Sequence, residues 1–165
     1  MQHTDIEREA FRQRLASASL QEALQLSDDT LDSITRLTAA HYADGKVESA
    51  LALCRGLVHL RPRDARGWTA LGAILVRLDR HDEALPALDE ALRLDPDDIA
   101  ALVNRAECHL AAADNRRAAV DLDRAIELDP GQRDLAANRA RQIAFAMYAV
   151  FEQCRLEGLD TAQVS

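Results

Sequence analysis

A fixed interval of 34 residues governs most of this chain. Pro62, Pro96 and Pro130 stand at that interval, and each follows an apolar stretch with helical periodicity. Because proline cannot continue a helix, each one marks a helix end. The same interval separates three further sets: Ala50, Ala84 and Ala118; Cys54, Leu88 and Leu122; Leu57, Ala91 and Ala125. The sequence therefore predicts three helix pairs, 31–43 with 47–60, 65–78 with 82–94, and 99–112 with 115–128.

The middle unit, residues 65–98, carries a set of residues at fixed offsets: Trp68, Leu71, Gly72, Leu75, Ala84, Leu88, Ala91 and Pro96. These residues resemble the signature of the tetratricopeptide repeat. The resemblance implies an all-α helical-hairpin solenoid with three repeats, at about 31–64, 65–98 and 99–132. We expect Gly72 and Ala84 to let the helices of a pair cross closely, and Trp68 and Leu88 to fill the space between pairs.

The flanks of the repeats are also predicted to be helical. Residues 1–30 form an N-terminal helical segment on the evidence of Ile6, Ala10, Phe11 and Leu15, and Ser27 begins N-cap chemistry before Leu31. Residues 132–157 form a long helix whose apolar stripe runs through Ala136, Ala140, Ile143, Met147, Val150 and Cys154. This helix should cap the last repeat, and its outer end is a candidate partner or dimer contact. Residues 158–165 are predicted to be a flexible tail.

Composition narrows the function classes. The net charge of −8 disfavours nucleic acid and anionic membranes as direct partners, since both require a basic surface. No apolar run approaches the roughly 20 residues that span a bilayer, and residues 1–14 lack the apolar core of a signal peptide. The three cysteines are odd in number and form no CxxC pair, which fits a reducing compartment. We therefore predict a cytoplasmic protein.

Catalytic and metal-binding readings of the chain are weak. Glu107, Cys108 and His109 are consecutive in a predicted helix, so their side chains point about 100° apart and cannot converge on one atom. The histidines lack metal-ligand spacing, and helix capping explains the acidic clusters 27–29 and 95–98 better than a calcium loop does. The prediction is a protein without enzymatic activity, metal or cofactor.

By the family resemblance, the first helix of each pair lines a concave, peptide-binding groove. The predicted groove residues are Thr35, Ala39, Tyr42, Arg66, Thr69, Ala73, Val76, Arg77, Val103, Glu107 and Leu110. Most of them are small or apolar, which suits an extended apolar segment of a protein client. The alternative is that several of them pack against the terminal helix. Repeat proteins that grip heat-shock chaperone tails carry cations at positions held here by Thr35, Ala39, Ala70, Ala100 and Asn104, so that function is not expected.

The whole chain also resembles the class II chaperones of bacterial type III secretion. The stretches that carry the resemblance are 26–31, 41–46 and Ala106-Glu107-Cys108, with Tyr42 as the remaining aromatic of the first repeat helix. The resemblance implies a cytoplasmic chaperone that keeps a hydrophobic translocator soluble before export, touches membranes only through that client, and forms a homodimer through its N-terminal helix. The alternative is a generic bacterial scaffold that docks the preformed surface of a folded partner.

Overall fold

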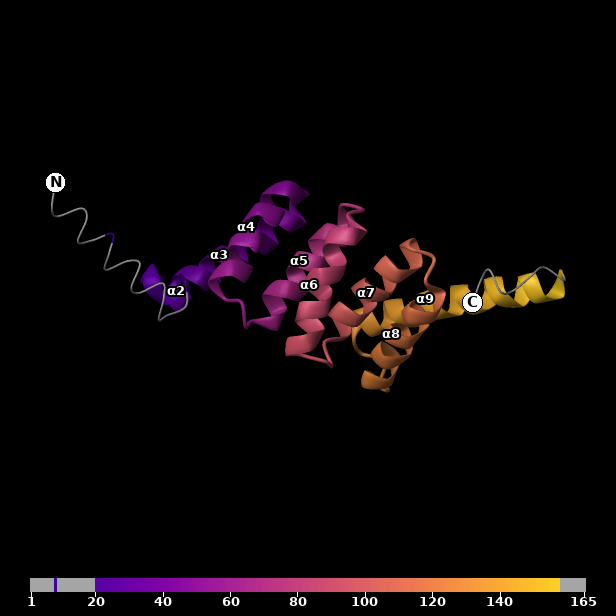
Figure 1. Cartoon of the computed structure of the whole chain (residues 1–165). Coiled ribbons are helices and arrows are strands. Elements are labelled where there is room, and N and C mark those ends of the chain that lie inside the picture. The colour runs from indigo at the N-terminus through magenta and orange to yellow at the C-terminus, as the bar shows by residue number, and fades with distance from the viewer. Residues whose placement is uncertain (1–7, 9–19, 158–165) are drawn as a thin grey trace. The chain divides into compact units, whose positions relative to one another are not determined.

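The computed structural model describes residue 8 and residues 20–157, which fall into two compact units, residues 1–67 and 68–165. All regular elements of the described residues are α-helices, as the repeat predicts (Figure 1). The apolar positions expected at Ile6, Ala10, Phe11 and Leu15, and the tail 158–165, lie outside the described residues.

The first unit contains α2 (Leu20–Ala23), α3 (Asp28–Ala43), α4 (Val47–Leu60) and the start of α5 (Ala65–Arg77). Helix α3 packs against α4, which α2 also contacts. The helix expected from residue 31 begins earlier, because the Ser27 hydroxyl accepts the backbone N–H of Thr30 at 3.2 Å and caps the helix there.

The second unit contains the rest of α5, then α6 (His81–Leu94), α7 (Ile99–Ala111), α8 (Asn115–Leu128) and α9 (Leu135–Leu156). Helix α7 packs against α6 and α8, and α9 contacts both α7 and α8. Helices α4, α6 and α8 end at Leu60, Leu94 and Leu128, just before the three spaced prolines, which confirms their role as helix ends. The fourth proline, Pro86, lies inside α6.

The turn within each helix pair repeats in geometry although not in sequence. Gly45, Asp79 and Ala113 adopt positive φ angles of 76°, 60° and 58° at the 34-residue interval. In each turn the next N–H bonds back to a carbonyl five residues earlier, as from Lys46 to His41 and from Asp114 to His109, both at 2.8 Å. This is the C-terminal motif that usually places glycine in the left-handed conformation. Only the first pair has glycine there, so the last two turns carry some backbone strain.

The core is built from the positions that recur every 34 residues. Ala50, Ala84 and Ala118 are fully buried, as are Leu88 and Leu122 at a second recurring position. Gly72 is a required close approach: a Cβ added there would stand 2.5 Å from Leu88 Cγ. Leu88, expected between the pairs, thus packs against Gly72 of its own pair.

Candidate peptide-binding site

Three predicted groove residues lie on α3 of the first unit. Thr35 and Ala39 are exposed, and Tyr42 is half-buried. The Thr35 hydroxyl donates to the Leu31 carbonyl at 2.9 Å, so its polar atom is satisfied within its own helix. What this face offers outward is therefore a methyl group, a small alanine side chain and one aromatic ring, which suits apolar contacts.

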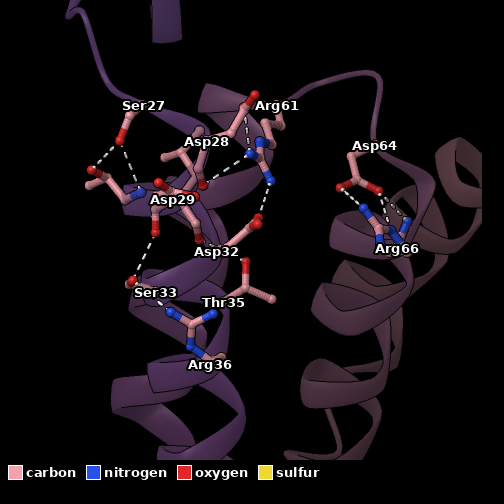
Figure 2. Close-up of polar contacts among 12 residues, drawn as sticks. Ser27, Asp28, Asp29, Asp32, Ser33, Thr35, Arg36, Arg61, Asp64 and Arg66 are labelled. Carbon is pink, nitrogen blue, oxygen red and sulfur yellow. Dashed lines mark hydrogen bonds and ion pairs between the residues drawn. The ribbon is translucent and has the colours of Figure 1, made fainter.

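The N-terminal end of α3 is held by an arginine from the end of α4. Figure 2 shows Arg61 reaching two carboxylates, with Nη1 2.9 Å from Asp32 Oδ1 and Nη2 2.7 Å from Asp28 Oδ1. Hydrogen bonds from the Gln21 amide and from Arg61 lower the pKa of Asp28. The acidic start of α3 is therefore neutralised locally and also favours the positive end of the helix.

Arg66, the fourth predicted residue of the first unit, forms a local fork with Asp64. Its Nε and Nη2 each lie 3.0 Å from an oxygen of that carboxylate, as Figure 2 shows. The same aspartate accepts the backbone N–H of Arg66 at 3.1 Å, which caps the start of α5. Hydrogen bonding to Arg66 lowers the pKa of Asp64. An anionic client group at Arg66 would have to compete with this carboxylate.

The α5 residues of the second unit differ in exposure. Thr69 is buried, and its hydroxyl donates to Asp98 Oδ2 at 2.6 Å. Asp98 also caps α7 by accepting the Ala101 N–H, so Thr69 joins α5 to the start of α7 and contributes little to a surface. Ala73 and Val76 are half-buried, and Arg77 is exposed. The apolar surface of this stretch therefore comes from Ala73 and Val76.

The α7 residues face toward α9 or the core. Val103 is buried, and the Glu107 carboxylate lies 2.6 Å from Arg139 Nη2 of α9. Burial raises the pKa of Glu107, although Arg139 opposes the shift. Leu110 lines an apolar cavity together with α8 and α9 residues. For Glu107 and Leu110 the geometry favours the alternative reading, packing against the terminal helix.

The geometry around Glu107, Cys108 and His109 keeps the three side chains apart. Cys108 is fully buried, and burial raises its pKa to about 11, whereas His109 Nε2 lies 4.0 Å from Asp121 Oδ2. Within the described ranges, no three His, Cys, Asp or Glu side chains gather closely enough to hold a metal ion. In the same ranges, none of the helices has the length and apolarity needed to cross a membrane.

One cluster escaped the sequence reasoning. Arg105 of α7 forks onto Asp121 of α8, with Nε–Oδ2 at 2.8 Å and Nη2–Oδ1 at 2.7 Å, and its Nη1 lies 2.9 Å from Asp89 of α6. Hydrogen bonding to Asp121 raises the pKa of Arg105 further. These residues do not recur at 34-residue intervals, so repeat logic has no signal for them. The cluster fixes three helices to one another.

Comparison with known sequences places the chain. The sequence model described as Tetratricopeptide repeat matches residues 39–99 and 69–133, which together cover more than half of the chain. The chain belongs to the tetratricopeptide repeat family. No curated protein sequence matches it significantly.

Solved structures of this family narrow the likeness. The type III secretion translocator chaperone SycD of Yersinia enterocolitica matches with a TM-score of 0.71 and 23% identity, over 79% of this chain and 98% of SycD. PcrH of Pseudomonas aeruginosa, in complex with the chaperone-binding region of PopD, matches with a TM-score of 0.69 and 29% identity, over 75% of this chain and 95% of PcrH. PcrH with the corresponding region of PopB gives 0.65 and 29%, over 71% and 96%. The resemblance to translocator chaperones is thereby confirmed.

Proposed function

We propose that this tetratricopeptide repeat protein is a type III secretion chaperone that binds an extended apolar segment of a hydrophobic translocator. The observation that carries the proposal is the likeness to PcrH at 29% identity, since PcrH is solved with the chaperone-binding regions of two different proteins. The chain also spans nearly the whole length of PcrH. Binding would take place in the cytoplasm before export and would keep the client soluble.

The surface chemistry of the first repeat helices supports an apolar client. Ala39, Tyr42, Ala73 and Val76 are exposed or half-buried, and the charged Arg66 is already bound to Asp64. Asn104, at a position where carboxylate-gripping repeats have a cation, is buried and donates to the Ala100 carbonyl at 2.8 Å. A client held by apolar pockets, without a buried charge clamp, can be released at the secretion apparatus.

The proposal is tested by purifying the tagged full chain from its host and identifying the bound proteins by mass spectrometry. The proposed function predicts one or two secreted proteins with long apolar segments that are soluble only when this chain is present. Recovery of folded cytosolic or envelope proteins instead would support a scaffold and overturn the chaperone.

Calorimetry with the captured client then tests the groove. Tyr42→Ala combined with Val76→Asp should weaken client binding at least about a hundredfold, because an aromatic contact is lost and a charge enters an apolar wall. Val120→Asp is the matched control, since Val120 is exposed on α8, a second helix of its pair. Equal affinity of the double variant and the parent, with unchanged circular dichroism, would refute the predicted groove.

A further inference from the structure

The first half of α9 occupies the register of a fourth repeat that is never completed. Ala140 stands 34 residues after Ala106, and both are fully buried. In the preceding pairs the chain turns at a left-handed residue, the last of them Ala113. The corresponding position, Met147, lies inside α9, which continues to Leu156. Within residues 20–157, therefore, no second helix folds back over α9.

The two halves of α9 differ in what holds them. The inner half is tied to α7 through Arg139 and Glu107, and to the end of α8 through Arg141, which donates to the Asp129 carbonyl. The outer half extends beyond α8, as the yellow end of the helix in Figure 1 shows. Its exposed apolar residues are Phe145 (75%), Tyr148 (63%), Val150, Phe151 and Leu156.

The apolar stripe of α9 has the spacing of a helix–helix seam. Ala140, Ile143, Met147, Val150 and Cys154 alternate steps of three and four residues. The stripe begins in the part of α9 that is buried against the repeats, and it continues without a break onto the outer half. A 3.5-residue spacing keeps one stripe facing a second helix, so the natural partner of the outer half is another helix.

A groove accompanies the stripe. An open cavity of about 880 Å³ lies between the start of α8 and α9, lined by Leu110, Ala119, Ile143, Met147, Val150 and Phe151, and we term it the α8–α9 groove. Among the described residues that line it, Arg116 is the one with a charge, and no described residue forms an ion pair with it. Arg116 also stands at the positive end of α8. The groove therefore fits an apolar helix with acidic residues along its edge.

We propose that the occupant of the α8–α9 groove is α9 of a second copy of this chain, packed antiparallel in a symmetric dimer. The outer half of α9 supplies both requirements, since it carries the apolar stripe together with Glu152 and Glu157. The negative C-terminal end of the second helix then lies toward the positive end of α8 and Arg116. A two-fold axis through the crossing makes both contacts at once, because each copy offers one groove and one helix.

The exposed area is sufficient for such a dimer. Aromatic side chains bury about 150–250 Å² each, and the outer half of α9 carries three of them. With Val150 and Leu156, two copies reach roughly the 1,200 Å² at the lower end of specific interfaces. We therefore expect a dimer that dissociates in the micromolar range.

Sedimentation equilibrium of the full chain over a range of concentrations tests the proposal. The parent should shift from the 18.2 kDa monomer to twice that mass as its concentration rises. Tyr148→Asp combined with Phe151→Asp should weaken association at least about tenfold, because charge enters the seam. Leu135→Asp is the matched control, since Leu135 is an exposed apolar residue at the opposite end of the same helix. Val150→Asp provides a second disruption, and circular dichroism verifies that each variant is folded.

A second comparison separates this interface from an N-terminal one. Phe11→Asp lies in the segment that the family resemblance proposes as the dimer contact, and it should leave the α9 dimer intact. Loss of the dimer in Phe11→Asp alone, an unchanged dimer in both α9 variants, or a monomer at every concentration would each overturn the proposal. Loss in the α9 variants with retention in Leu135→Asp and Phe11→Asp would support it.

Discussion

The two units each use one arginine to hold helices together, and the two arginines differ in an instructive way. The side chains of Arg61 and Arg105 are similarly covered, with 20% and 24% of their surface exposed. Their partners are not alike. Asp28, bound by Arg61, is 79% exposed, whereas Asp121, bound by Arg105, is 5% exposed.

The burial of the carboxylate therefore decides what each cluster contributes. An exposed carboxylate that loses its arginine is solvated by water, so the loss is small. A buried carboxylate that loses its arginine remains as an unpaired charge away from water, and the folded state bears that cost. The same contact geometry thus acts as a surface tether in the first unit and as a structural requirement in the second.

The largest expected effect follows from removing Arg105. Arg105→Ala should lower the free energy of unfolding by about 3 kcal/mol or more, because it leaves Asp121 buried and unpaired. Urea unfolding followed by circular dichroism measures the change. The double variant Arg105→Ala with Asp121→Ala should be more stable than Arg105→Ala alone, since no orphaned charge remains. A double variant that is less stable than the single one would contradict this account of the cluster.

Two helix glycines extend the comparison with an effect of intermediate size. Gly72→Leu in the second unit should destabilise by about 1–3 kcal/mol or more through overpacking, because even a Cβ there collides with Leu88. Gly56→Ala in the first unit meets open space within α4, so it should stabilise by about 0.5–1 kcal/mol through helix propensity. Thermal unfolding of both variants checks the contrast. A Gly72→Leu variant that melts at the parental temperature would show that the assigned repeat register is wrong.

The repeat register was predictable because it depends on local sequence at fixed intervals. Proline ends, alanine and leucine core positions and the Ser27 cap act within a few residues of chain, and each recurs or follows a known capping pattern. The left-handed turn at Ala113 is predictable only by analogy with Gly45, because alanine itself does not favour that conformation.

The site was less predictable because it depends on which side chains meet across helices. A repeat offset assigned Thr69, Glu107 and Leu110 to a surface, but Asp98 engages the first, Arg139 the second, and the third lines a cavity with α9. These partners are specific to this chain and carry no periodic signature. The exposed or half-buried apolar residues, such as Tyr42 and Val76, stay predicted contacts of the client.

The smallest expected effect concerns the surface tether of the first unit. Arg61→Ala should destabilise several-fold less than Arg105→Ala, and salt should reduce the difference from the parent, because Asp28 and Asp32 remain solvated. The pH dependence gives the sign. The pKa of Asp28 is lowered in the folded state, by Gln21 and then by Arg61, so this contribution is present above the ordinary aspartate pKa and is lost as pH falls through the lowered value. Unfolding curves of parent and variant should therefore converge in acid, and a gap that widens as pH falls would contradict the tether.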